Sequence, residues 1–465
     1  MNNKHILRSL LPVILLSFVT VHLFSQDFGF GFADEETGNS GGTNNSFSIA
    51  VGGEVSASML GYFYDFSKGP DYTALGNIFS GKLTFSAHTS FAEGVIDFNV
   101  LPAEMPDNSL SPLSVNEAYI RVFPGKLDIT AGLRKLTWGK ADSMGPLDVI
   151  NPLDYSRIFT EMADNTSLIH IKIARPLIHA AFRFGNFSKI EGVFVPWFEP
   201  HLIPRTGRWA ASQMEMLAMK NYSMELPPIG SISIPITVAE PNTTTLNYAQ
   251  AGLRFSTTIG SADFSAQYYY GRLPQPSAGL TVKFTEPIDP NIPPMPENIQ
   301  VDVLYNPYHQ VGFDYAQVLF GFNTRAELAV TITGDLKGDD GSVYNPSIAW
   351  SLGFDRDIIW NINLNLQVTE SIRLLHSNLG SDDPMSAVTG NYDIEGGQPL
   401  TATRLTAVVS RKFFRDELEL RTAVVWGIED RDCVIMPAII WTKDTISAAF
   451  SGGFFTGNTD GQIGQ

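Results

Sequence analysis

The chain has 465 residues, of which 44% are hydrophobic and only 17% are charged, and its formal net charge is −17. This composition is too apolar for a disordered chain, and the excess of acidic residues disfavours nucleic acid and anionic membrane surfaces as partners. The single cysteine, Cys433, rules out an intrachain disulfide and a cysteine-based metal site.

Residues 1–25 have the features of a cleaved secretory signal peptide. Lys4, His5 and Arg8 supply a positive start, residues 10–24 form an apolar segment, and Ser25-Gln26 is a plausible cleavage point. The apolar segment is shorter than the roughly 20 residues that a membrane-spanning helix requires. We therefore expect an exported chain, with a flexible acidic Gly/Asn-rich lead-in over residues 26–45.

From residue 46 onward, polar and apolar residues alternate over many segments. In residues 360–369, WNINLNLQVT, every second residue is apolar and those between are Asn, Gln or Thr. Successive side chains of a strand point to opposite faces, so each segment predicts a strand with one apolar and one wet face. Because the segments often reach the roughly 9–11 residues that cross a bilayer, they favour a membrane barrel over a soluble sandwich. We predict a transmembrane antiparallel β-barrel over residues 46–465, with about 16–18 or more strands.

The strand count leaves some assignments open. Residues 166–175 and 177–185 read as two strands, and residues 231–238, SISIPITV, as a further strand that the count omits. Long loops are expected at 139–165, 199–244, 273–307 and 371–402, and one short loop helix at 209–219. Not every long loop falls on one side of the barrel with this count, so at least one strand is missed or invented.

The end of the chain, GNTDGQIGQ, is polar and turn-like. Phe454-Phe455 is the last aromatic pair, and these final nine residues do not have the pattern of a strand. Either the sequence stops about one strand short of a closed barrel, or another strand closes it. We favour the first alternative, because an unpaired strand edge in lipid is costly.

No arrangement typical of an enzyme is present: the chain lacks a Gly-x-Ser-x-Gly elbow, a His-Glu-x-x-His motif and a phosphate-binding glycine loop. We expect no enzymatic activity, no cofactor and no metal site. The polar strand faces instead predict a lumen that carries both signs of charge. The residues predicted to line it are Glu117, Arg121, Arg134, Lys172, Arg254, Arg325, Glu327, Arg404, Glu417, Glu419 and Arg421.

One stretch, residues 134–154, differs from the rest because a strand passes into a loop rich in Gly, Pro and Asp. Its distinctive residues are Arg134, Trp138, Gly139, Asp142, Asp148, Asn151, Pro152 and Asp154. This pattern resembles a poorly characterised family of porin-like outer-membrane β-barrels of diderm bacteria, in which a strand ending in Trp-Gly leads into an Asn-Pro-x-Asp loop. The resemblance implies an outer-membrane barrel and a channel for small solutes. It also implies a final strand that ends in an aromatic residue, which the end of this sequence lacks.

The residues themselves leave the role of this loop open. Trp138 is expected at the membrane interface, and Asn151-Pro152 is expected to fix a turn. If the loop folds inward it narrows the pore; if it stays outside, its aspartates cap turns. We favour turn-capping and ordering of the loop over cation binding, because the aspartates lack a regular spacing for oxygen ligands.

The sequence thus predicts a passive porin-like channel in the outer membrane, with lipid, small solutes and the barrel-assembly machinery as partners. A surface-exposed adhesin or structural barrel is the first alternative. An importer of apolar compounds is the second, because Met214, Met216, Met219 and Met224 lie close together in the chain.

Overall fold

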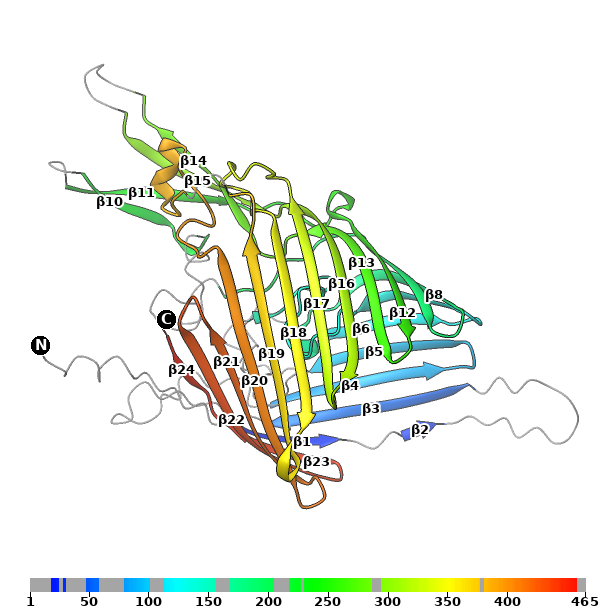
Figure 1. Cartoon of the computed structure of the whole chain (residues 1–465). Helices are drawn as coiled ribbons and strands as arrows, with labels where there is room; N and C mark the ends of the chain where they lie inside the picture. The colour runs from blue at the N-terminus through cyan, green and yellow to red at the C-terminus, as the bar shows by residue number, and fades with distance from the viewer. Residues whose placement is uncertain are drawn as a thin grey trace, which may run out of the picture.

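A computed structural model describes residues 18–24, 28–30, 47–57, 79–100, 113–155, 168–204, 217–226, 230–286, 294–376 and 380–457. Nearly all regular structure in these residues is antiparallel strand, in one large curved sheet that forms a barrel wall (Figure 1). None of the helices in the described residues is long and apolar enough to cross a membrane.

Each strand of the wall pairs with the wall strand that follows it in the chain. At two places, strands that do not belong to the wall lie between these partners in the sequence. The wall strands are β3 (Ser48–Ala57), β4 (Phe79–His88), β5 (Ala92–Val100), β6 (Leu113–Val122), β7 (Leu127–Arg134), β8 (Arg175–Phe184), β9 (Ser188–Val195), β12 (Gln250–Ile259), β13 (Ala262–Arg272), β16 (Pro307–Leu319), β17 (Phe322–Thr333), β18 (Ser347–Asp357), β19 (Ile362–Arg373), β20 (Thr401–Phe413), β21 (Leu418–Gly427), β22 (Asp432–Lys443), β23 (Ile446–Ser451) and β24 (Phe454–Thr456). β23 and β24 both pair with β22 and together occupy one position in the wall.

The two ends of this sheet meet through the N-terminal residues. β1 (Phe18–Phe24) pairs with β23 on one side and with β3 on the other, and β2 (Phe28–Phe30) also pairs with β3. The sheet therefore closes on itself, as the prediction of a barrel requires. β1 lies within the segment predicted to be a signal peptide; its cleavage remains a prediction, as does the missing C-terminal strand, since residues 458–465 lie outside the described residues.

The observed strands explain why the predicted strand count did not place all long loops on one side of the barrel. The strand predicted at 166–175 is not found in its described part: Leu168–Ile171 form a short 3-10 helix, and the next strand, β8, begins only at Arg175. The strand predicted there was therefore the invented one. Without it, every long connection between the described wall strands from β3 to β23 lies at one end of the barrel, the loop end, and the connections at the other end, the turn end, are short.

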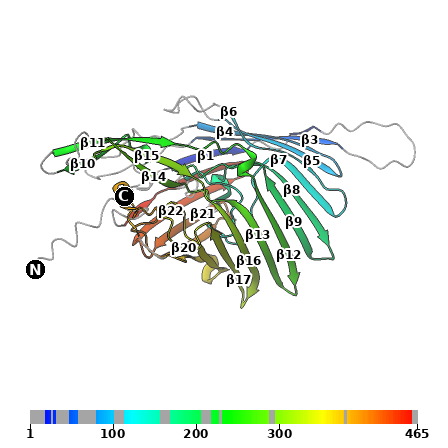
Figure 2. The same ribbon diagram turned by 90° about the horizontal axis from the view of Figure 1, so that it is seen from above.

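The residues 231–238 do form a strand, but outside the barrel wall. β10 (Asn221–Leu226), β11 (Gly230–Ala239), β15 (Pro296–Leu304) and β14 (Ser277–Phe284) make a separate four-stranded sheet at the loop end, the cap sheet, which extends to one side of the barrel (Figure 2). Its core includes Phe198, Ile234, Ile299 and Val301. The predicted helix at 209–219 lies almost entirely outside the described residues.

The two faces of the wall differ as the alternation predicted. Outward positions of neighbouring strands carry exposed apolar side chains, such as Phe255, Phe313 and Leu328. The inward positions between them carry polar groups, including Arg254, Asp314 and Glu327. Aromatic residues of the wall divide in the same way: Trp441 is outward and partly exposed, whereas Tyr269 is inward and fully buried.

Candidate functional site: a loop folded into the barrel

Residues 135–154, the inner loop, leave β7 at the loop end and contact inward-facing side chains on the far part of the wall. Their partners lie on β13, β16, β17 and β19, well beyond the strands next to β7 in the sheet. Of the two positions that the sequence allowed for this loop, the structure thus has the inward one.

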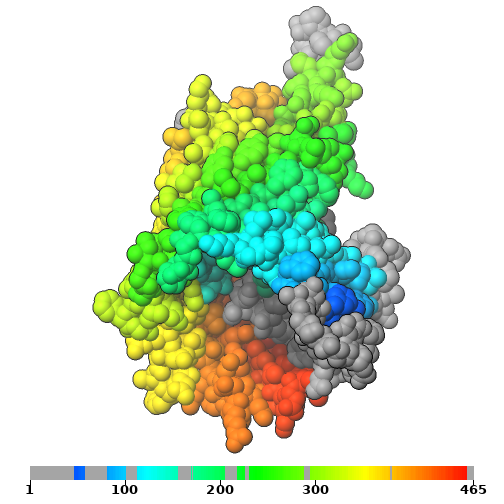
Figure 3. Space-filling model, turned by 90° about the vertical axis from the view of Figure 1, so that its right-hand side faces the viewer, coloured from blue at the N-terminus to red at the C-terminus, as the bar shows by residue number. Residues whose placement is uncertain are grey.

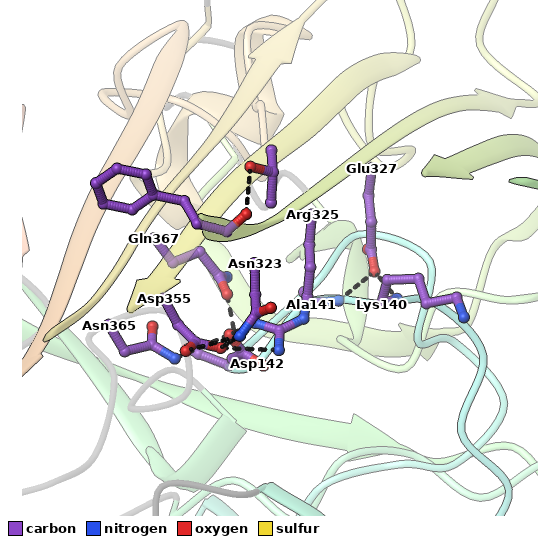
Figure 4. Close-up of polar contacts among 12 residues, drawn as sticks. Lys140, Ala141, Asp142, Asn323, Arg325, Glu327, Asp355, Asn365 and Gln367 are labelled. Atoms are coloured by element: carbon purple, nitrogen blue, oxygen red, sulfur yellow. Dashed lines mark hydrogen bonds and ion pairs between the residues drawn. The ribbon is translucent and has the colours of Figure 1, made fainter. Parts of the chain in front are cut away.

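The carboxylate of Glu327 on β17 is the centre of this contact (Figure 4). The backbone N–H groups of Lys140 and Ala141 donate to its Oε1, the second at 2.7 Å, and the N–H of Leu147 donates to Oε2 at 3.3 Å. Glu327 is only 4% exposed. The loop backbone therefore replaces water as the hydrogen-bond donor to this buried anion, and bonds of this kind are among the stronger ones in proteins.

Two glycines let the loop come this close to the carboxylate. A Cβ added at Gly139 or at Gly145 would lie 2.5 Å from a carboxylate oxygen of Glu327. Gly139 also has a φ of +100°, a conformation that side chains other than glycine strongly disfavour. The Trp-Gly pair that the sequence singled out is thus needed at the point where the loop wraps around Glu327.

The tip of the loop is held by a second set of polar contacts. Asp142 pairs with the Arg325 guanidinium and accepts a hydrogen bond from Asn365 at 2.9 Å, and Arg325 also binds Asp355 at 3.0 Å. Gln367 on β19 accepts from the N–H of Ser143 and donates to the carbonyl of Met144, at 3.1 and 3.0 Å (Figure 4). These contacts fix the tip against β17, β18 and β19.

An apolar cluster holds the beginning of the loop. Trp138 is 1% exposed and makes an edge-to-face contact with Tyr269, with ring centroids 6.4 Å apart. A Cβ at Gly252 would lie 2.8 Å from the Trp138 ring, and one at Gly312 would lie 2.1 Å from the Leu147 side chain. The other members of the cluster are Ile150, Leu177, Val193, Val195 and Tyr308. The expectation that Trp138 lies at the membrane interface was wrong, because it packs inside the barrel.

Asn151 joins the two ends of the inner loop. Its Oδ1 accepts from the N–H of Leu136 at 2.7 Å, and its Nδ2 donates to the carbonyls of Arg134 and Ile173 at 3.1 and 2.9 Å. The neighbouring Pro152 carbonyl accepts from the N–H of Ile173 at 2.8 Å. The Asn-Pro pair therefore does order the loop, although it acts as a bridge between chain segments rather than within one turn.

Asn151→Asp is expected to loosen the loop while keeping the shape of the side chain. The aspartate has no donor, so two backbone carbonyls lose their partner and face a carboxylate oxygen instead. We expect the loop contact to weaken by about 2–4 kcal/mol. Limited proteolysis in detergent would measure this as faster cleavage within residues 135–154, and cleavage at the wild-type rate would contradict it.

Two aspartates of the loop, Asp142 and Asp148, act as ion-pair partners rather than as turn caps, which corrects the expectation from sequence for these two residues. Asp142 binds Arg325, and Asp148 binds Lys172 at 2.6 Å, while Lys172 also donates to Thr137 at 2.6 Å. Asp154 lies in a bridge to the loop that follows β9. No group of three potential metal-ligating His, Cys, Asp or Glu side chains converges within the described residues.

His201 connects the inner loop to the next long loop. Its Nδ1 accepts from the N–H of Leu153 at 2.8 Å, and its ring packs edge-to-face on Tyr155. Burial, together with the nearby Arg175, lowers the pKa of His201 to about 4. The neutral ring is therefore the form that this contact requires.

Acid should weaken the His201 contact. Because the folded pKa lies below the unfolded value of 6.5, the unfolded segment binds more protons between these values, and stability falls as the pH drops from about 6.5 towards 4. We expect protease sensitivity of this segment to rise over that range. His201→Gln should flatten the pH dependence, whereas an unchanged profile in this variant would contradict the role of His201.

The structure places the residues predicted to line the pore in different surroundings. On β6 and β7, Glu117 accepts from the N–H of Lys135, Arg121 binds Asp128, and Arg134 lies over the Tyr119 ring. Those engaged with the inner loop or buried beside it are Lys172, Arg254, Arg325 and Glu327. On the remaining wall, Arg404, Glu419 and Arg421 hold inward positions of β20 and β21, whereas Glu417 lies in the turn before β21.

Several residues of the site were not predicted from the sequence. Gln267 and Gln310 donate to the carbonyls of Leu147 and Pro146 at 3.0 and 3.1 Å. An inward-facing glycine in a strand, such as Gly312, could have indicated these contacts, because it marks a close approach of another part of the chain.

No protein-family model matches the chain, and no curated protein matches it either. Among solved structures, the outer membrane channel DcaP of Acinetobacter baumannii is 10% identical, with 95% of this chain and 96% of that chain covered and a TM-score of 0.38. OmpF of Salmonella typhi is 8% identical over 96% of this chain and 97% of that chain, with a TM-score of 0.36. OprB of Pseudomonas putida is 9% identical over 97% and 94%, with a TM-score of 0.36. Values this low establish neither a family nor a function.

Proposed function

We propose that the chain is an outer-membrane channel through which small hydrophilic solutes diffuse, and that the inner loop narrows its pore. The observation that carries the proposal is the attachment of this loop to the far part of the wall through Glu327 and Asp142. A loop that is merely a surface connection would not need buried inward-facing partners on four strands.

The two faces of the wall support the location. The outward face is apolar, as lipid requires, and the inward face carries polar and charged groups of both signs, as a water-filled lumen requires. The arrangement of loops agrees with this: the long loops are extracellular in bacterial barrels, which would place the turn end in the periplasm. The assembly machinery for outer-membrane barrels would insert such a chain.

Planar-bilayer recording of the refolded chain tests the proposal. Discrete single-channel steps are expected, and their size should increase when residues 140–147 are replaced by a short Gly/Ser linker. A correctly folded chain that gives no steps in either form would overturn the proposal.

The cap sheet is the observation that favours the alternative of a surface-binding barrel. It has its own buried core and extends beyond the barrel mouth, so it offers a surface that a simple pore does not need. If this alternative holds, removal of residues 217–239 should abolish the adhesion of cells that carry the protein on their surface. The conductance steps should remain intact. The third reading, an importer of apolar compounds, stays a prediction, because Met214 and Met216 lie outside the described residues.

A further inference from the structure

Three basic side chains lie on the lipid-facing side of the wall, close to the turn end. Arg356, Arg411 and Lys443 are on β18, β20 and β22, each within three residues of the strand's end. The register places them at outward positions, in phase with the exposed Val409 and Trp441. These strands are the yellow to red part of the wall in Figure 1, and the orange and red part lies below the cyan strands in Figure 3.

The rest of the wall lacks this feature where the structure describes it. On β3 to β17, the two outward positions nearest the turn end are uncharged in every strand, for example Ile259 on β12 and Phe322 on β17. Charged side chains on a lipid-facing surface are costly, so they are rare there without a partner. Because all three basic side chains lie on one side of the barrel, we expect an anionic partner on that side.

Neither arginine has such a partner among the residues that the structure describes. The Arg356 guanidinium lies 4.9 Å from the centroid of the Phe322 ring and donates to the Phe320 carbonyl at 3.3 Å. The Arg411 guanidinium lies 4.7 Å from the Phe413 centroid, and its buried Nε has no hydrogen-bond partner within the described ranges. In the part of the chain that the structure describes, neither side chain forms an ion pair with a carboxylate. Their aromatic neighbours hold the guanidinium groups in place without neutralising them.

An apolar groove of about 530 Å³ adjoins Arg411 on the same outer surface. Arg411 shares one cross-strand row with Leu420, Ile439 and Phe450, which form one side of the groove. In the next row towards the loop end, Thr422 lies opposite Pro437, and the Pro437 carbonyl accepts from the N–H of Gly452 at 3.0 Å. The groove lies over this row, where Thr422, Pro437 and Gly452 are smaller than the neighbouring Leu420, Ile439 and Phe450.

We propose that this surface binds one anionic glycerophospholipid, with its phosphate at Arg411 and Arg356 and one acyl chain in the groove. The two arginines lie two strands and two residues of register apart, or about 12 Å, a distance that long side chains can span to reach a single headgroup. Guanidinium groups bind phosphate oxygens through paired, charge-assisted hydrogen bonds. The groove supplies an apolar surface directly beside the charge, which free phosphate could not use. The inference depends on the lipid-facing wall and not on conduction through the pore.

Native mass spectrometry of the full chain from mixed phosphatidylglycerol and phosphatidylcholine micelles would test the proposal. We expect phosphatidylglycerol to be retained preferentially, and each of Arg411→Gln and Arg356→Gln to reduce its retention roughly fivefold. Arg431→Gln is the matched control, because Arg431 lies in the turn between β21 and β22 at the loop end. Thr422→Phe, which fills the groove without changing the charge, should also reduce retention.

Each other outcome overturns the proposal. Equal retention of the two lipids would show that the arginines do not select an anion. Displacement of the lipid by glycerol phosphate alone, together with normal retention by Thr422→Phe, would show a phosphate site without an acyl chain. Heat-dependent gel mobility would confirm that every variant forms the barrel before its lipids are counted.

Discussion

Glu327→Ala is expected to release the inner loop from the wall and to increase the single-channel conductance. Three backbone N–H groups of the loop donate to the Glu327 carboxylate. Hydrogen bonds to a charged group contribute about 1.5–3 kcal/mol each, so the loop contact should weaken by at least about 4 kcal/mol. Planar-bilayer recording would show larger and noisier steps than in the wild type.

Two further variants separate this effect from a simple loss of charge. Glu327→Gln keeps one acceptor oxygen and should give an intermediate conductance. Asp97→Asn is the matched control: Asp97 is a buried inward acid on β5 that binds Thr84, Asn116 and Lys82, and none of these belongs to the inner loop. A conductance that rises equally in Asp97→Asn and Glu327→Ala would show that the charge of the lumen, and not the loop, sets the current.

Trp138→Ala should be the most destabilising substitution within the loop itself. The side chain is 1% exposed and packs against Tyr269 in the cluster at the beginning of the loop. Truncation of a buried tryptophan to alanine usually costs about 3–5 kcal/mol. We expect a lower unfolding temperature in detergent and rapid proteolysis of residues 135–154.

The same substitution at the outer surface provides the control. Trp441 is outward-facing and 39% exposed, so Trp441→Ala should leave proteolysis of the inner loop unchanged. Trp138→Phe should retain most of the stability, because the buried Trp138 Nε1 group has no hydrogen-bond partner in the described part of the chain and its loss costs little. Equal proteolysis in Trp138→Ala and the wild type would contradict the packing role of Trp138.

The barrel and its strand faces were predictable, because lipid on one side and polar groups on the other impose a period of two along each strand. Thus residues 360–369 gave the correct faces for β19, although Trp360 itself lies in the turn, with a φ of +58°. Residues 166–175 misled the count because Ile169, Ile171 and Ile173 imitate that period in a 3-10 helix and an irregular segment. Local alternation is ambiguous in segments this short.

The importance of residues 134–154 was also predictable, but their arrangement was not. Glycine, proline and aspartate mark an irregular loop whether it lies outside or inside a barrel. The deciding contacts join Lys140, Ala141 and Leu147 to Glu327, which is about 180 residues further along the chain. Contacts between residues this far apart leave no periodic signal in the sequence. Trp138 also packs on a distant residue, Tyr269, so the sequence did not indicate its position inside the barrel.

Chemical labelling of the loop during conduction tests most directly whether the inner loop lies in the conduction path. Met144 is on the loop and 38% exposed, so Met144→Cys can be made in a Cys433→Ser background and treated with a cationic thiol-specific reagent. The control is Phe320→Cys, a 95% exposed position in the turn between β16 and β17. We predict that labelling reduces the single-channel current at Met144→Cys and not at Phe320→Cys. Complete labelling of Met144→Cys, verified by mass, with an unchanged current would contradict a loop that narrows the pore.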